Sequence, residues 1–217
     1  MFLRKPMPVE GKTRREVLTE FRRAEILAAA RKVFAARGFR DATLEEVAQE
    51  AGLAKGTLYL YFSSKEEMFW DIFRGSIMEM QERLAAVLAG AGNAEEKIRA
   101  GLRVRFECLR EDQDFMRIYF TEFGQCIYGG PWAKEFRKLH LAGARLLAPV
   151  LEQGVRSGEL RPVPPLETAL ALMDLVKSTV SLKLLGMHET RFDLEQFIFD
   201  LFWRGVRAEG ATAQGER

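Results

Sequence analysis

The sequence predicts an all-α protein of about nine helices. Apolar residues recur at the three- and four-residue spacing of amphipathic helices along most of the chain. Breaks rich in glycine or proline separate these periodic segments, and few segments show the strict alternation of a strand. The breaks fall at Gly38, Gly52, residues 90–93, residues 129–131, residues 158–165 and residues 186–190.

These breaks define the expected elements in chain order. Residues 1–12 hold prolines and a glycine among basic residues and are expected to form a mobile arm. The small, polar residues 210–217 are expected to form a disordered tail. The expected helices cover residues 14–37, 44–51, 55–61, 64–89, 94–111, 113–127, 132–157, 165–186 and 193–208.

The first helix has one apolar stripe and a clear stop signal. The stripe contains Ile26, Ala30, Val33 and Phe34. The helix is expected to stop at Gly38, because glycine is the usual residue just beyond a helix end.

Residues 43–62 predict two short helices around a tight turn. Thr43 can cap the first of them, with Glu46 three residues later as the second member of a capping box. Val47 and Ala48 face inward, and Ala48 must be small because the second helix crosses it. Gly52 gives the turn its backbone freedom. This arrangement is a helix-turn-helix.

The second short helix is expected to have an outward face suited to DNA. Leu53, Leu58 and Phe62 close its core. The helical period then leaves Gly56, Thr57, Tyr59 and Leu60 outside. Hydroxyls, a ring and a bare glycine surface suit close approach to a groove and its phosphates. The competing interpretation is an ordinary helical hairpin.

A long helix follows at once. Ser64 and Glu67 form a second predicted capping box at its start. Its apolar side is continuous and includes Met68, Phe69, Ile72, Phe73, Ile77, Met80, Leu84, Val87 and Leu88. Because no linker precedes it, we expect this helix to couple an N-terminal head to a C-terminal body.

Residues 22–70 resemble the N-terminal domain of the TetR family of bacterial transcriptional regulators. The matching residues are Ile26-Leu27-x-Ala29-Ala30, Phe34-x3-Gly38-Phe39, Thr43-x3-Val47-Ala48-x3-Gly52, Lys55-Gly56-Thr57-Leu58-Tyr59-x-Tyr61-Phe62 and Lys65-Glu66. The family often has serine where this chain has Ala54, so that cap is absent here. It often has a polar residue where this chain has Leu60.

The resemblance implies that the head binds double-stranded operator DNA. We expect Gly56 and Thr57, at the helix start, to lie nearest the base edges. Tyr59, Tyr61 and Lys65 are better placed for phosphates. The expected DNA-binding residues are Thr43, Lys55, Gly56, Thr57, Tyr59, Tyr61 and Lys65.

Aromatic residues and methionines crowd one region of the body. They are typical first of a buried core helix, and some of them could also line a small-molecule site. The resemblance favours a site for an apolar or amphipathic effector. Arg105, Arg117, Glu122, His140 and Lys177 are candidate polar groups within it. The expected pocket residues are Phe106, Leu109, Phe115, Met116, Tyr119, Phe120, Phe123, His140, Met173 and Lys177.

The last two helices carry more apolar surface than one packed face needs. The resemblance implies a two-fold four-helix interface there, and a palindromic operator requires a dimer. The expected interface residues are Leu172, Leu175, Thr179, Leu182, Phe197 and Leu201.

Charge and motif content narrow the function class. Residues 1–40 carry 11 lysines and arginines against 4 glutamates, whereas the remainder has 22 basic and 27 acidic residues. A basic head on a mildly acidic body fits DNA binding.

The sequence shows no catalytic or phosphate-loop motif. No metal-ligand spacing, signal peptide or apolar run of membrane length is visible. Cys108 and Cys126 are expected to be free thiols in a reducing cytoplasm.

The sequence therefore predicts a cytoplasmic, non-enzymatic transcriptional regulator without a cofactor. Residues 13–63 form the DNA-binding domain and residues 64–209 the regulatory and dimerisation domain. A small-molecule effector is expected to release this homodimeric repressor from its operator. The alternatives are an architectural DNA-binding protein without a ligand and an all-α ligand carrier.

Overall fold

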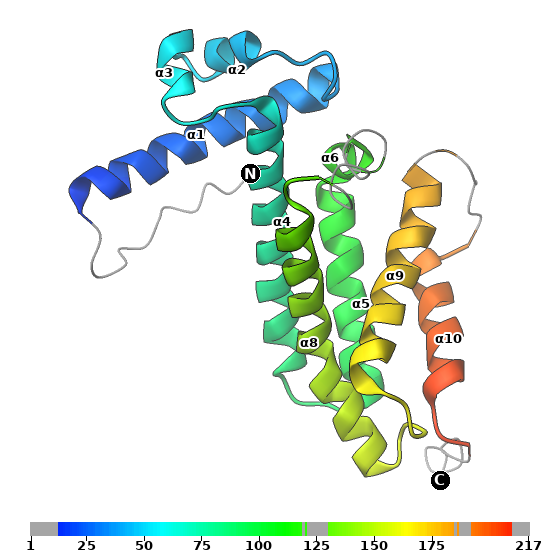
Figure 1. The fold of residues 1–217 in the computed structure, drawn as a ribbon. Coiled ribbons are helices and arrows are strands. Elements are labelled where there is room, and N and C mark those ends of the chain that lie inside the picture. The colour runs from blue at the N-terminus through cyan, green and yellow to red at the C-terminus, as the bar shows by residue number, and fades with distance from the viewer. Residues whose placement is uncertain (1–12, 119, 121–129, 185, 187–191, 210–217) are drawn as a thin grey trace. The chain divides into compact units, whose positions relative to one another are not determined.

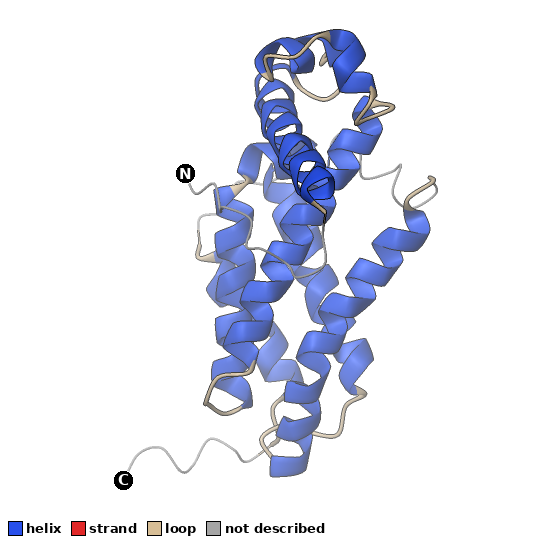
Figure 2. Cartoon of the chain, turned by 90° about the vertical axis from the view of Figure 1, so that its left-hand side faces the viewer, coloured by secondary structure: helices blue, strands red, loops and turns tan. Residues whose placement is uncertain are grey.

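The computed structural model describes residues 13–118, 120, 130–184, 186 and 192–209. All regular secondary structure in these residues is helical (Figures 1 and 2), apart from an isolated antiparallel bridge between Leu160 and Arg207. The predicted all-α class is confirmed. None of the helices in these residues is long and apolar enough to cross a membrane.

The chain divides into two compact units, Met1–Phe73 and Arg74–Arg217, which we call the head and the body. The division falls within α4. The helices are α1 (Arg14–Arg37), α2 (Leu44–Glu50), α3 (Lys55–Tyr59), α4 (Lys65–Leu88), α5 (Ala94–Glu111), α6 (Gln113–Ile118), α8 (Ala133–Ser157), α9 (Pro165–Leu184) and α10 (Leu194–Val206).

Side-chain caps set the helix boundaries of the head. Thr13 and Glu16 form a capping box at the start of α1, and Thr43 and Glu46 form the predicted one at the start of α2. α1 ends at Gly38, whose φ of 80° is a conformation that few residues other than glycine adopt. Two reciprocal hydrogen bonds thus replace the missing intrahelical partners at each N-terminus.

An aromatic core holds the head together. The rings of Phe34, Phe39 and Phe69 contact one another, with centroid separations of 5.2 to 5.9 Å. Ile26 from α1 and Leu58 from α3 are completely buried beside them. α2 packs against both α1 and α3. This packing fixes the turn at Gly52, which joins α2 to α3.

The body is a helical bundle with a continuous apolar core. α8 packs against α9 and α5, and α10 packs against α5 and α9 (Figure 1). Gly154 of α8 permits a close approach at one end, because a β-carbon there would lie 2.7 Å from Leu160 and 2.9 Å from Ala94. The core includes Leu84, Ile98, Leu102, Phe106, Ala144, Leu151, Ala169, Met173, Val176, Ile198 and Phe199.

Several helix boundaries differ from the prediction, mostly by one or two residues. α3 ends at Tyr59 rather than at residue 61, and a turn follows in which the N–H groups of Tyr61 and Phe62 both donate to the carbonyl of Leu58. α6 is described only to Ile118, and residues 121–127 of the expected helix lie outside the described residues. α9 is assigned to Leu184 rather than to residue 186.

The predicted capping box at the start of α4 is half correct. The hydroxyl of Ser64 accepts from the N–H of Glu67 at 3.1 Å, as expected. The carboxylate of Glu67 instead reaches back to Ser63, accepting from its N–H at 2.8 Å and its hydroxyl at 2.7 Å. The carboxylate therefore caps one residue earlier than a capping box requires.

Candidate functional site

The outer surface of α3 is set by the burial of its inner side. Leu58 and Phe62 are buried, which fixes the rotation of the short helix. Gly56 and Lys55 are exposed, Tyr59 is 47% exposed, and Leu60 is 81% exposed. Thr57 is half-buried. The residues that the sequence places on the outside of α3 thus lie there, with Thr57 at the edge of this surface.

Gly56 leaves open space beside the backbone of α3. A β-carbon built at this position meets no other atom within 4 Å. Packing within the protein therefore does not require glycine here. What glycine provides is a bare stretch of helix that another molecule can approach closely.

Lys55 is held by an exposed ion pair. Its ammonium contacts the carboxylate of Glu45 on α2, and both side chains are about half exposed. The hydrogen bond between them raises the pKa of Lys55 and lowers the pKa of Glu45. The Lys55 ammonium also lies 6.0 Å from the centre of the Tyr59 ring. A charge in so exposed a pair is readily exchanged for a phosphate.

Thr43 is committed to the N-terminus of α2. Its hydroxyl accepts from the N–H of Glu46 at 3.2 Å and donates to the Glu46 carboxylate at 3.1 Å. Ala54 supplies no side-chain cap to α3, as its chemistry predicts.

Lys65, which is expected from the sequence to contact a phosphate, is bound to backbone carbonyls of the head. Its ammonium donates to the carbonyls of Phe39, Arg40 and Ala42, at 2.9, 2.7 and 3.1 Å. An ammonium has three donor hydrogens, so these bonds use all of them. Lys65 therefore positions the loop between α1 and α2, and a phosphate contact would require giving up part of this support.

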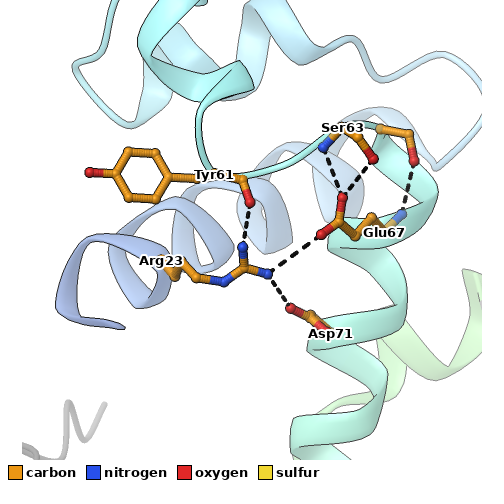
Figure 3. A network of polar contacts seen from close by, with 6 residues as sticks. Arg23, Tyr61, Ser63, Glu67 and Asp71 are labelled. Carbon is orange, nitrogen blue, oxygen red and sulfur yellow. Dashed lines mark hydrogen bonds and ion pairs between the residues drawn. The ribbon is translucent and has the colours of Figure 1, made fainter. Parts of the chain in front are cut away.

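Arg23 of α1 connects α1 to the region where α3 meets α4, a role that the sequence did not predict (Figure 3). Its guanidinium donates to the carbonyl of Tyr61 and lies 2.7 Å from Asp71 and 3.6 Å from Glu67. It also lies over the ring of Phe62, 4.0 Å from its centre. Because the hydrogen-bond partners are 38 and 48 residues away in sequence, no local pattern could have indicated them.

The expected pocket residues of the body have different environments. Phe106 and Met173 are buried in the core, and Leu109 packs against it. Met116 and Phe120 are half-buried. Tyr119 and Phe123, and the side chain of Phe115, lie outside the described residues.

Four helices of the body converge at Gly143 of α8. A β-carbon at Gly143 would lie 3.1 Å from the methyl group of Met173, 3.2 Å from Nε2 of Gln81 and 3.7 Å from Nη2 of Arg105. These side chains come from α9, α4 and α5. Gln81 also donates to the carbonyl of Leu139 at 2.7 Å. The side chains of Gln81 and Arg105 thus place polar groups next to Met173 of the bundle core.

His140 and Lys177 both lie near the carboxylate of Asp174. Lys177 Nζ is 2.8 Å from the Asp174 carboxylate, and Nε2 of His140 is 3.8 Å from it. Burial lowers the pKa of His140, and the nearby charge of Asp174 opposes this shift. The His140 ring stacks on Phe136 at 5.8 Å. His140 is therefore favoured in its neutral form.

The last two helices expose several large apolar side chains. Leu182 is 41%, Phe197 is 45% and Leu201 is 52% exposed, and the Phe192 ring lies 5.0 Å from that of Phe197. Leu172, by contrast, is buried in the core of the body. A residue covered in this way cannot contact a partner, so Leu172 belongs to the core. Leu175 and Thr179 are half-buried.

The sequence of the head matches a known family model. Residues 26–72 match the model described as "Bacterial regulatory proteins, tetR family". The HTH-type transcriptional repressor KstR2 of Mycobacterium tuberculosis is 30% identical over 141 residues, covering 65% of this chain and 70% of KstR2. The HTH-type transcriptional regulator YfiR of Bacillus subtilis is 32% identical over 158 residues, covering 68% of this chain and 72% of YfiR.

Solved structures show the same fold. The regulator FadR from Bacillus subtilis, solved in complex with stearoyl-CoA, superposes with a TM-score of 0.72 at 22% identity, covering 85% of this chain and 99% of FadR. The ketosteroid regulator KstR2 of Mycobacterium tuberculosis superposes with a TM-score of 0.63 at 25% identity, covering 87% of this chain and 96% of KstR2. The matched head and the identity of at least 30% to KstR2 and YfiR, each over at least 70% of the relative's length, establish that the chain belongs to the TetR family of bacterial transcriptional regulators.

Proposed function

We propose that this chain is a repressor that binds a two-fold operator as a homodimer and is released by an amphipathic organic effector held in the body. The observation that carries the DNA-binding part is the anchored α3, with its exposed Gly56, Tyr59 and Lys55. A short helix with a bare backbone and hydrogen-bonding side chains fits a major groove.

The roles within the DNA interface follow from exposure and existing contacts. Gly56 and Thr57, at the start of α3, approach the base edges. The Tyr59 hydroxyl and the Lys55 ammonium bind phosphates, with Lys55 leaving Glu45 to do so. Tyr61 supports the interface from the end of α3, while Thr43 and Lys65 hold the elements that present it.

A dimer formed through α9 and α10 fits the exposed apolar residues there. Leu182, Phe197 and Leu201 lie on these two helices and are each more than a third exposed. Exposed apolar side chains grouped on adjacent helices mark interaction surfaces. A two-fold dimer would also match the symmetry of a palindromic operator.

Two relatives support an amphipathic effector. One is named for ketosteroid regulation and another was solved with stearoyl-CoA. Both point to large molecules with an extensive apolar part, which suits a helical bundle whose core includes Phe106 and Met173. To reduce operator affinity a hundredfold, the effector must favour one state of the protein by about 2.7 kcal/mol, within the usual range of coupling.

The decisive experiment sequences genomic fragments retained by the purified protein and then measures affinity for the recovered site. Gly56→Trp is expected to abolish binding, because an indole cannot fit between α3 and a groove. Gly75→Trp on α4 is the matched control, since a β-carbon at Gly75 would also meet no other atom within 4 Å. If Gly56→Trp binds as tightly as Gly75→Trp, the assignment of α3 is wrong. If no fragment is enriched, the ligand-carrier alternative is favoured.

A further inference from the structure

We propose that the body binds an organic oxyanion through Arg105, so that the effector is an amphipathic acid rather than a neutral lipophile. The proposal rests on the proposed function in assuming that the body holds an effector. It adds the charge of that molecule and the residue that recognises it. By sequence alone, Arg105 is one of five candidate polar groups. The tertiary structure distinguishes it from His140 and Lys177, whereas Glu122 and the side chain of Arg117 lie outside the described residues.

Arg105 points toward the middle of the bundle. Its Nη2 lies 3.7 Å from a β-carbon position on Gly143 of α8, where Gln81 and Met173 also converge. Its neighbour in sequence, Phe106, is buried in the core. A guanidinium placed among α4, α5, α8 and α9 is removed from bulk water. This burial lowers the pKa of Arg105 to about 10, so the group remains charged at neutral pH.

The guanidinium has unused donors. Among the described residues, none forms a hydrogen bond or an ion pair with it, and its nitrogen atoms are not completely covered. A guanidinium has five N–H donors, and a charge withdrawn from water normally has a partner. Donors that are enclosed by protein yet still accessible indicate a place for a small acceptor.

Among the described residues, the charges near Arg105 do not neutralise it. The Asp174 carboxylate is 2.8 Å from Lys177, which compensates its charge. His140 is favoured as the neutral ring, because burial lowers its pKa. Gln81 carries no charge and donates to Leu139. The described groups around Arg105 therefore carry a net positive charge, which an incoming anion would balance.

The geometry of the guanidinium defines the class of ligand. Its planar fork matches the two oxygens of a carboxylate or a phosphate in parallel hydrogen bonds. Met173 and Phe106 provide apolar surface for the rest of the molecule. A ligand that combines one such oxyanion with an apolar skeleton satisfies both features. A free carboxylic acid and an acyl-CoA both carry this chemistry.

The test compares acids with their neutral esters. The probes are a fatty acid, a bile acid and an aromatic acid, each with its methyl ester, together with a fatty acyl-CoA. Binding to the DNA-free protein is measured by calorimetry. At least one acid or the acyl-CoA should bind at least about tenfold more tightly than the esters, as charge-assisted hydrogen bonds imply. Preference for the free acid would identify a carboxylate, and preference for the acyl-CoA a phosphate.

Arg105→Met should remove this preference and leave binding of the esters unchanged. Arg103→Met is the control, since Arg103 lies on the same helix with a 63% exposed side chain. Arg105→Lys should bind the anion with intermediate affinity, which shows that the site remains folded. The proposal is overturned if neither an acid nor the acyl-CoA binds, if the esters bind equally well, or if Arg105→Met retains the preference.

Operator binding is measured separately, so that the two proposals can fail independently. If an acid binds through Arg105 without reducing DNA affinity, the anion site stands and the release mechanism falls. If only a neutral ester releases the DNA, the release mechanism stands and the anion site falls.

Discussion

The guanidinium of Arg23 on α1 lies 2.7 Å from the carboxylate of Asp71 on α4. The same guanidinium donates to the carbonyl of Tyr61, just beyond the end of α3. One side chain of α1 therefore holds the C-terminal end of the proposed recognition helix against the helix that follows. A carbonyl in that position has no intrahelical partner, so this donor satisfies a group that the end of α3 leaves open.

Replacing Arg23 by methionine should destabilise the head. The change removes charge-assisted hydrogen bonds and takes away the charge that faces Asp71, whose side chain is only 14% exposed. We expect the free energy of unfolding to fall by about 1–3 kcal/mol, measured by urea denaturation. Arg22→Met is the control, because Arg22 pairs with Glu25 on the surface and should change stability by less than about 0.5 kcal/mol. Equal losses in the two variants would contradict the role of Arg23.

The two lysines of the head should differ in what they contribute. Lys65→Met removes three donors from the loop carbonyls and should lower the unfolding free energy by about 1.5–3 kcal/mol. Lys55→Met should leave stability unchanged, because its ion pair with Glu45 is exposed. It should instead lower the slope of log affinity against log salt by about one, as loss of one phosphate contact does. The same salt slope in both variants would overturn this division.

Dimerisation should depend on Phe197. Phe197→Glu would place a charge in a desolvated interface and should yield monomers by light scattering at micromolar concentration. Met78→Glu is the matched control, since Met78 is 49% exposed on α4 of the body and is not part of the proposed interface. A Phe197→Glu protein that remains dimeric would place the interface on another surface.

His140 should make the body less stable in acid. Its pKa is lowered by burial, so the unfolded chain binds more protons than the folded one as pH falls below the ordinary value of about 6.5. The unfolding free energy should therefore decrease between that pH and the lower folded-state pKa. His140→Phe keeps a ring against Phe136 and removes the titration. The melting temperature of the wild type should fall relative to this variant on acidification, whereas a pH-independent difference would contradict the assignment.

Local signals in the sequence determine much of the head. The capping pair of Thr43 and Glu46, the stop at Gly38 and the period that buries Leu58 while exposing Tyr59 all depend on residues within a few positions of one another. Helical periodicity and capping act over that distance, so these features can be predicted along the chain. The same reasoning locates the helices of the body and their apolar faces.

Contacts between distant segments are decided only by the tertiary structure. The sequence favours Lys65 on the DNA side, but the fold brings the backbone of residues 39–42 within reach of its ammonium. Leu172 is expected at the dimer surface, but helix packing covers it. Arg105 is distinguished from His140 and Lys177 only by the packing of four helices at Gly143. A side chain's partners depend on which helix faces it, and that is a property of packing between segments that no spacing in the sequence records.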